Sequence, residues 1–365
     1  MAGTSRGFAG NRDRLIEAGG ALQTLRRIRA TLAGPLGTAV LAVLALLVIV
    51  FVIVPNVISQ GLGLFVQILA YGVADGAIYA LIALGYTLVY GIIELINFAH
   101  GDVFTLGAFV SLPLLGAFGL VEGKSGGAHL VLGLLAVFLI TMLIIGLVNV
   151  TIERVAYRPL RNAPRLAPLI TAVGMSFILE GIMYLWRGAF NVHYPDLLPG
   201  NRISIAGGAS IGIKDLIVIA IAALLVGLFS LFLSRSRLGK AMRATAQDRD
   251  AALLMGIDIN QTIALAFFLG AVLAAAGGII FGLYFNSVRF DLGFESGLIA
   301  FTAAVFGGIG NVPGAALGGL IIGLVQAFSN AYVASQWSDV IIFAILILVL
   351  VFRPTGLLGM RVPEK

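Results

Sequence analysis

The chain has 365 residues, of which 60% are hydrophobic and 11% are charged, with a formal net charge of +6. Soluble domains carry about 25% charged residues, so this composition excludes an ordinary soluble protein. The lack of cysteine excludes disulfides, zinc–thiolate sites and thiol catalysis. The positive charge does not call for nucleic acid, because most basic residues lie between apolar runs, where they determine membrane topology.

Long uncharged runs predict an all-α, polytopic membrane helix bundle. A membrane helix needs roughly 20 apolar residues, and a lipid-exposed backbone must satisfy its own hydrogen bonds. The runs are continuous instead of alternating, which excludes a β-barrel. We expect about ten helical segments, including one short broken or re-entrant helix. They are 36–58, 63–91, 103–120, 130–152, 166–187, 214–234, 259–285, 297–309, 314–334 and 337–352.

The first 35 residues are predicted to form a basic cytoplasmic extension, separate from a transmembrane domain at 36–360. Within it, apolar residues recur at helical spacing among arginines; they are Leu15, Ala18, Leu22, Leu25 and Ile28. Two interpretations stay open: an amphipathic helix on the inner leaflet, and a solvated tail that only enforces orientation. The first apolar run is interpreted as a retained anchor, because no cleavable signal peptide is evident.

A polar interruption at 97–102, reading Asn-Phe-Ala-His-Gly-Asp, separates the second and third segments. Asp102 is expected to cap the next helix, and Asn97 to satisfy broken backbone groups. The alternative is that this helix N-terminus faces a solute path and favours a carboxylate. A lone histidine is more often a packing hydrogen bonder than a metal ligand or proton site, so we interpret His100 as a packing hydrogen bonder.

A second interruption follows the segment 297–309, which is too short to cross a membrane comfortably. It is glycine-rich and continues into a full span. Irregular backbone at membrane depth is tolerated only inside protein or along a wet cavity, and broken segments in corresponding halves point to a transport site. The candidate pathway residues are Asn97, Phe98, His100, Gly101, Asp102, Gly307, Gly308, Gly310, Asn311, Pro313 and Gly314.

The stretch Arg243–Gly256 is charge-dense and lies between uncharged apolar runs, within a connection at 235–258. We expect a short helix there, outside the bilayer on the cytoplasmic side, with Gly256 permitting a tight turn after it. The residues expected to form this loop are Gly239, Arg243, Asp248, Asp250, Ala251, Ala252 and Gly256.

Small residues recur four apart in two segments. They are Gly270, Ala274, Gly278 and Gly282 in one, and Gly314, Gly318, Gly319 and Gly323 in the other. Such faces let membrane helices approach closely, so we interpret them as packing surfaces.

The distribution of lysine and arginine predicts the orientation. With the N-terminus inside, the inner segments hold 18 of the 23 basic residues and the outer loops hold five, which places both termini in the cytoplasm. The longest outer loop, 188–213, is then extracytoplasmic. It is interpreted either as a docking surface for a partner or as an aromatic interfacial belt that includes Trp186.

Several strings in order along residues 63–360 resemble the H-type permease subunit of branched-chain amino acid ABC importers, the high-affinity branched-chain amino acid transport family. They begin at Ile78 (IYALIALG), Ile96 (INFAHGD), Glu153 (ERVAYRPLR), Met255 (MGID) and Phe352 (FRPTGLLG), and include Ala304–Gly314. Asp250, Ala251, Ala252 and Gly256 also resemble the E-A-A-x-x-x-G loop of bacterial ABC importer permeases, with Asp in place of Glu.

The resemblance implies a multi-pass subunit in the inner membrane of a bacterium. Its implied partners are a second homologous permease subunit, two ATP-binding subunits and an extracytoplasmic solute-binding protein, with lipid around it and no nucleic acid. In that family the loop at 235–258 docks into a cleft of the ATP-binding subunit. No cofactor, metal or catalytic residue is expected on this chain, since it lacks the G-x-x-x-x-G-K-[ST] phosphate loop. ATP is expected on the partners.

Three alternatives stay open at this point. Related urea and short-chain amide ABC permeases share much of the pattern. An ion-coupled secondary amino acid transporter is disfavoured by the charged stretch at 243–256 and by the lack of an acidic array along one segment. A non-transport membrane protein, such as a channel or scaffold, is the third; dependence of uptake on ATPase partners distinguishes it.

Overall fold

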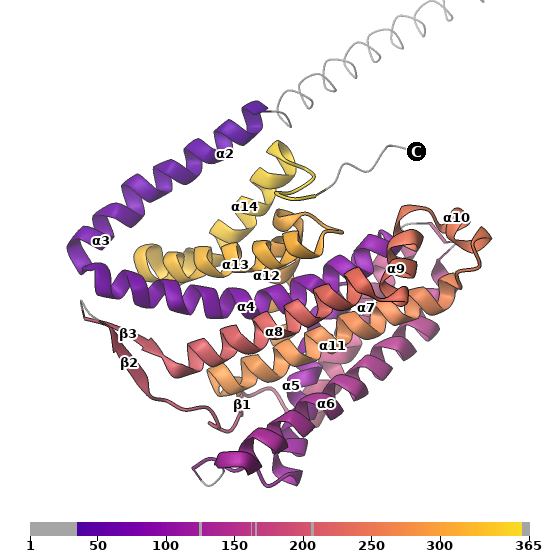
Figure 1. Cartoon of the computed structure of the whole chain (residues 1–365), viewed down its shortest axis with the longest axis horizontal. Coiled ribbons are helices and arrows are strands. Elements are labelled where there is room, and N and C mark those ends of the chain that lie inside the picture. The colour runs from indigo at the N-terminus through magenta and orange to yellow at the C-terminus, as the bar shows by residue number, and fades with distance from the viewer. Residues whose placement is uncertain (1–34, 124–125, 162, 165, 206–207, 360–365) are drawn as a thin grey trace, which may run out of the picture.

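The computed structural model describes residues 35–123, 126–161, 163–164, 166–205 and 208–359. The extension predicted at residues 1–34, with the helix expected there, lies outside the described residues. Within them the chain is a bundle of helices, whose long members α4, α8 and α11 run side by side (Figure 1).

Most of the helices follow the apolar runs of the sequence, whereas α9 and α10 lie in the charged connection at 235–258. Their bounds are α2 Pro35–Val48, α3 Val54–Gln60, α4 Leu62–Ile93, α5 Ala99–Ala117, α6 Gly127–Ile152, α7 Leu166–Arg187, α8 Ile213–Arg235, α9 Arg237–Gln247, α10 Arg249–Leu254, α11 Ile259–Phe285, α12 Leu292–Gly307, α13 Val312–Ser329 and α14 Ser338–Phe352. Among the described residues, eight helical stretches are long and apolar enough to cross a membrane, and the last of them, 312–352, contains α13 and α14. A polytopic helical bundle is therefore confirmed.

In the part of the chain that the structure describes, four short strands depart from the all-α prediction. β1 (Val192–His193) pairs antiparallel with β4 (Ser287–Val288), and β2 (Arg202–Ile205) pairs antiparallel with β3 (Ala209–Gly212). All four lie in connections between helices, and three of them lie in the loop 188–213. Backbone groups outside the helices need partners too, and pairing in these loops satisfies them.

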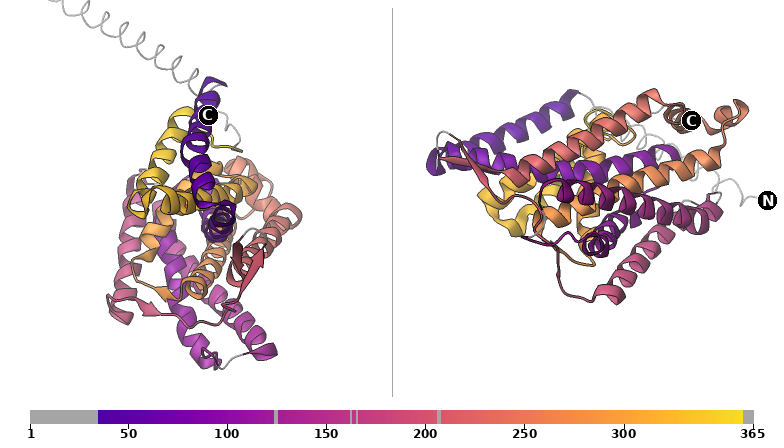
Figure 2. Two further views of the ribbon diagram at one scale, coloured as in Figure 1. Left: turned by 90° about the vertical axis from the view of Figure 1, so that its left-hand side faces the viewer. Right: turned by 60° about the horizontal axis from the view of Figure 1, so that its bottom comes forward.

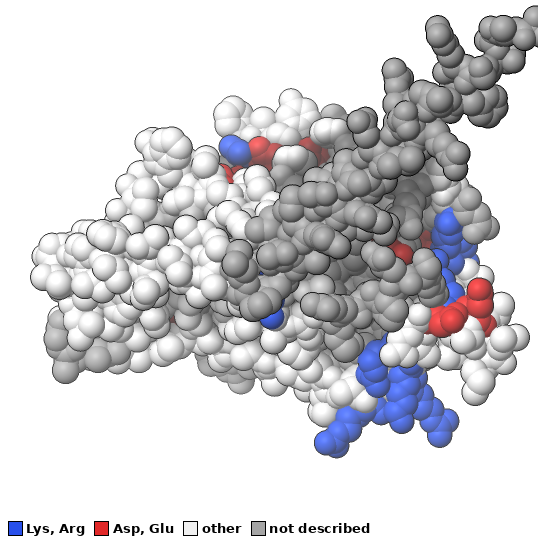
Figure 3. All heavy atoms as spheres, turned by 90° about the horizontal axis from the view of Figure 1, so that it is seen from above, with Lys and Arg blue, Asp and Glu red and all other residues white. Residues whose placement is uncertain are grey.

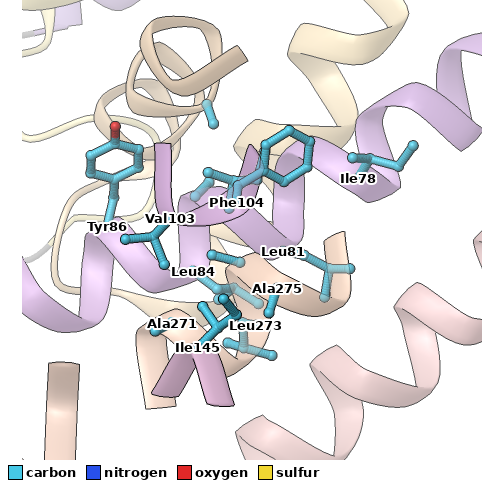
Figure 4. Close-up of a cluster of buried hydrophobic side chains, with 14 of the residues drawn as sticks. Ile78, Leu81, Leu84, Tyr86, Val103, Phe104, Ile145, Ala271, Leu273 and Ala275 are labelled. Atoms are coloured by element: carbon cyan, nitrogen blue, oxygen red, sulfur yellow. The ribbon is translucent and has the colours of Figure 1, made fainter. Parts of the chain in front are cut away.

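The centre of the bundle is formed by α4, α5, α11, α12 and α13, whose inward residues form one apolar core. Figure 4 shows part of it, with Leu81 and Leu84 of α4 close to Phe104 of α5 and Ala275 of α11. By contrast α6, α7 and α8 are mostly exposed along their length, and α2 with α3 lies along the outside of the bundle (Figures 1 and 2). The exposed apolar side chains on these outer helices suit contact with lipid.

Glycine permits the closest helix contacts, as the spacing of small residues predicted. A Cβ on Gly323 of α13 would collide with the backbone of Gly76 on α4, and one on Gly278 of α11 would collide with the carbonyl oxygen of Phe104. The two small-residue faces therefore bring α13 against α4 and α11 against α5.

Polar side chains begin the helices that follow irregular backbone. Ser236 accepts from the Gly239 amide at the start of α9, and Asp248 accepts from two amides at the start of α10. Asp258 and Asn311 cap α11 and α13 in the same way. Each side chain pairs amide groups that have no partner within the helix.

The break after α4 is shorter than predicted. α4 ends at Ile93 and is followed by Glu94, whose φ of 59° is left-handed, and α5 begins at Ala99 instead of Val103. His100, Gly101 and Asp102 are therefore inside the first turn of α5. Asp102 does not cap that helix as expected; its carboxylate accepts from the Ser176 hydroxyl of α7.

Candidate functional site: a projecting helix pair and two helix breaks

The segment α9–α10 projects at one end of the bundle, and most of its predicted residues hold its shape. Arg243 donates to the carbonyl groups of Leu233 and Ser234, which ties α9 to the end of α8. Gly239 packs so closely on Leu233 that a Cβ would collide with its backbone. Ala252 is buried.

The tip of α10 is apolar and exposed, a feature that the sequence interpretation missed. Leu254 is 88% exposed and Met255 is 83% exposed, with Leu253 beside them. Next to them Asp250 and Ala251 are also exposed. A large apolar side chain projecting from a charged surface is typical of a docking site. The signal was available as the L-L-M string directly before Gly256.

Gly256 forms the turn after α10, as predicted, but a larger side chain at this position would not clash with its neighbours. Its φ is +80°, and a Cβ placed on it would meet no atom within 4 Å. The requirement is conformational, since only glycine adopts this backbone at little cost.

Arg249, also missed by the sequence interpretation, connects α10 with the end of α4. Its guanidinium Nη2 donates to the Ile92 carbonyl at 2.6 Å. The pattern of charges could not have identified it, because the partner is a backbone oxygen 157 residues away.

The α4–α5 break encloses a polar cluster. Asn97 is buried, and its Oδ1 accepts from the Tyr157 hydroxyl at 2.7 Å. A small cavity of about 20 Å³ lies beside them, lined in part by Ile96 and Arg161. Phe98 is half-buried. Asn97 therefore pairs with a side chain, in addition to any role towards a solute.

His100 and Gly101 are packed against neighbouring helices. The His100 ring lies 4.7 Å from that of Tyr86, in an edge-to-face arrangement, and fills the space that a Cβ on Gly85 would need. Gly101 contacts Gly293 and Gly297 of α12 through their backbones. Packing accounts for both residues. The packing of His100 agrees with its interpretation as a packing hydrogen bonder, but neither of its ring nitrogens has a hydrogen-bond partner among the described residues.

A buried ion-pair cluster follows α6. The carboxylate of Glu153, wholly buried, accepts from Arg158 and Arg161, and Arg161 also donates to Asn260 Oδ1 at 2.6 Å. Burial lowers the pKa of the Arg161 guanidinium, while the Glu153 carboxylate acts in the opposite direction. Residues 153–157 form a π-helical turn, which presents Tyr157 to Asn97.

The α12–α13 break lies against the C-terminal turn. The amides of Leu357 and Leu358 donate to the carbonyls of Phe306 and Gly307, at 2.8 and 2.9 Å. Gly308, with φ +112°, leaves no room for a Cβ beside Gly359, and Asn311 donates to the Leu358 carbonyl at 2.6 Å.

The remaining residues of this break have separate roles. Gly307 and Gly314 pack against each other, and Pro313 is exposed in the first turn of α13. Gly310, with φ +88°, has open space around its Cα. A larger side chain at Gly308 would therefore displace the C-terminal turn. A larger side chain at Gly310 would have space, and only the positive φ would disfavour it.

The two breaks, predicted only to correspond, meet in space. A Cβ on Gly91, near the end of α4, would lie 3.4 Å from the Cα of Gly310. Ile96 and Ile309, one from each break, line one shallow depression with Tyr90. The assignment of these residues to a solute path stays a prediction.

Basic side chains gather at the end of the molecule that carries α9 and α10 (Figure 3). We call this the basic end. Its lysines and arginines come from α8, α9, α10 and the turns after α6; they are Arg154, Arg158, Arg161, Arg235, Arg237, Lys240, Arg243 and Arg249. The projecting tip and both breaks therefore lie at or beside one strongly basic surface.

Comparison with known proteins identifies a family of similar sequences. Residues 68–350 match a family described as the permease component of branched-chain amino acid transport systems. The chain is 44% identical to the high-affinity branched-chain amino acid transport system permease protein BraD of Pseudomonas aeruginosa, over 82% of this chain and 98% of the relative.

Two further relatives carry similar names. The chain is 42% identical to the permease protein LivH of Escherichia coli K12, over 82% of this chain and 97% of the relative. It is 28% identical to a probable branched-chain amino acid transport permease protein LivH of Methanocaldococcus jannaschii, over 76% and 88%. No solved structure matches. The chain belongs to the family of permease components of branched-chain amino acid transport systems.

Proposed function

We propose that this chain is the H-type permease subunit of an ATP-binding-cassette importer in the inner membrane of a bacterium, passing branched-chain amino acids inward. The observation that carries the proposal is the exposed apolar tip of α10 at the basic end of a chain from this family. A permease without its own ATPase needs a surface through which ATP hydrolysis acts on it, and this tip has the exposure and chemistry for that contact.

The proposed assembly contains a second homologous permease, two ATP-binding subunits and an extracytoplasmic solute-binding protein. We assign α9–α10 to the ATP-binding subunit, with Leu254 and Met255 as the anchors in its cleft. Anchors of this kind supply most of the energy of an interface when they are fully desolvated. The ATP is held by the partner, and this chain contributes the path.

The basic end is assigned to the cytoplasm, because basic residues stay on that side. The β2–β3 loop, at the opposite end of α8, is then extracytoplasmic. The chain has no cysteine, so one introduced residue gives one label. We expect Asn201→Cys, in the loop before β2, to react with an impermeant maleimide in intact cells and Val155→Cys, exposed at the basic end, to react only after the cells are opened. The reverse pattern would contradict this orientation.

The solute route is proposed to pass beside the two breaks, where Ile96 and Ile309 line the depression between them. Bound solute there would shield an introduced thiol. We expect leucine, delivered by the binding protein, to slow maleimide labelling of Ile309→Cys in the assembled complex. Val155→Cys is the control, since Val155 is 73% exposed at the basic end; equal slowing at both positions would contradict the assignment.

The function is tested by reconstituting the chain with its ATPase, permease and binding-protein partners in vesicles. We expect uptake of labelled leucine, isoleucine or valine. This uptake should require ATP inside the vesicles and the loaded binding protein outside them. Urea and acetamide serve as competitor solutes. Uptake of urea or amide alone would identify the related amide permeases, and uptake driven by an ion gradient without ATP would identify a secondary transporter.

A further inference from the structure

Two chains of polar contacts run from the α9–α10 region to the α4–α5 break. The first is short: Arg249, the first residue of α10, donates to the Ile92 carbonyl at 2.6 Å. Ile92 lies in the last turn of α4, where carbonyl groups have no partner within the helix. A cation at a helix C-terminus is also favoured by the helix dipole. One bond thus joins α10 to the residues that precede the break.

The second chain starts from α11, directly after the α9–α10 segment. Asn260, in the first turn of α11, accepts from Arg161 at 2.6 Å, and Arg161 is paired with the buried carboxylate of Glu153. Glu153 begins the π-helical turn that ends at Tyr157, and Tyr157 donates to Asn97 at 2.7 Å inside the break.

The two chains are adjacent at the basic end. Burial lowers the pKa of the Arg161 guanidinium, and the positive charges of Arg158 and Arg249 lower it further. Both chains enter the same five-residue break, one from the side of Ile92 and the other at Asn97. Every member except the exposed Asn260 is buried or half-buried, and breaking a buried ion pair or hydrogen bond is costly, so these contacts resist separation.

We propose that Arg249 and Tyr157 are positioning residues. Through the bonds of Arg249 to Ile92 and of Tyr157 to Asn97, they transmit movement of α9–α10 to the α4–α5 break. The proposal rests on the proposed function, since it assigns to these contacts the step between the ATP-binding subunit and the path. A break in a helix is where a small displacement changes the backbone most easily, and a π-helical turn often marks a functional site. Without these contacts α9–α10 still docks, but the break no longer follows it.

The first test measures coupling in the complete complex. Arg249→Met keeps the aliphatic stem and removes the donor, and Tyr157→Phe keeps the ring, which lies 5.5 Å from that of Phe267. We expect the ratio of ATP hydrolysis with leucine-loaded binding protein to hydrolysis without it to fall at least about fivefold for Arg249→Met and about threefold for Tyr157→Phe. The matched controls are Arg154→Met, exposed at the basic end, and Tyr184→Phe, exposed on α7; both should keep the parent ratio.

The second test reads the break directly. Leu95→Cys supplies a thiol within it, and we expect its labelling rate to differ between nucleotide-free and vanadate-trapped complexes. In Leu95→Cys with Arg249→Met, the two rates should become equal. This measurement needs no solute, so it tests the linkage even if leucine-loaded binding protein does not stimulate ATP hydrolysis by the parent complex. That lack of stimulation would overturn the proposed function, not the linkage.

Three results would overturn the linkage. The first is a parent-like hydrolysis ratio and labelling difference in Arg249→Met. The second is failure of both Arg249→Met and Tyr157→Phe to assemble. The third is an equal loss of hydrolysis with and without the binding protein. Either of the last two would show that the contacts only maintain the fold.

Discussion

Replacing Leu254 and Met255 together by aspartate is expected to abolish ATP-driven uptake, by at least about 100-fold. Each side chain projects almost fully from α10, and burying such a side chain in a partner contributes about 1.5–3 kcal/mol. Losing two of them costs about 3–6 kcal/mol, and each 1.4 kcal/mol is about tenfold in affinity. The charge introduced into an apolar cleft adds to that loss.

The measurement is co-purification of the ATP-binding subunits with the membrane-extracted permease, together with leucine uptake. Leu254→Met with Met255→Leu is the control, because it exchanges the two side chains and keeps the apolar surface. It should retain assembly and uptake. If the aspartate pair still brought down ATPase in normal amounts, α10 would not be the docking element.

Substituting Gly323 by leucine is expected to prevent accumulation of folded protein. The first atom of any side chain there would collide with the amide nitrogen and Cα of Gly76, and both atoms belong to backbone that cannot rotate away. Overpacking a core costs about 1–3 kcal/mol even where side chains can adjust. Separating α13 from α4 costs more, because these two helices make the most extensive contact in the bundle.

The fraction of monodisperse protein after detergent extraction measures this effect, with the unfolding temperature of whatever remains. Gly116→Leu is the matched control: Gly116 lies near the end of α5, and a Cβ there would meet no atom within 4 Å. A surface change of this kind alters stability by less than about 0.5 kcal/mol. Comparable yields for the two variants would show that α13 and α4 do not need their close contact.

Hydropathy alone identified most of the membrane helices, because lipid leaves a polypeptide few ways to satisfy its backbone. It misplaced the start of α5 by four residues. His100 and Asp102 are polar and were expected in the break, yet both are buried inside the helix. A polar side chain is tolerated there when a neighbouring helix supplies a hydrogen-bond partner, as Ser176 does by donating to Asp102. The sequence of a single segment does not reveal that neighbour.

The α9–α10 segment also combines local features with features that depend on its neighbours. Its position and charge, its Asp248 cap and the turn at Gly256 are local properties, and the sequence predicted a short polar helix ended by glycine. The projecting Leu254 and Met255 appear only when the helix is placed on the bundle, because exposure depends on what packs beside it. The same holds for Gly239, which fits against Leu233 where α9 folds back on α8.

The order of helices, the closeness of the glycine faces and the family follow from residue type and spacing along the chain, since lipid solvation and helix packing act on local patterns. The contacts that join the region of α9 and α10 to the α4–α5 break do not follow from any such pattern. Arg249 meets a backbone oxygen of Ile92, and Tyr157 meets Asn97 from 60 residues away. These pairs depend on how the helices are arranged in three dimensions, because a hydrogen bond needs its two atoms within about 3 Å of each other.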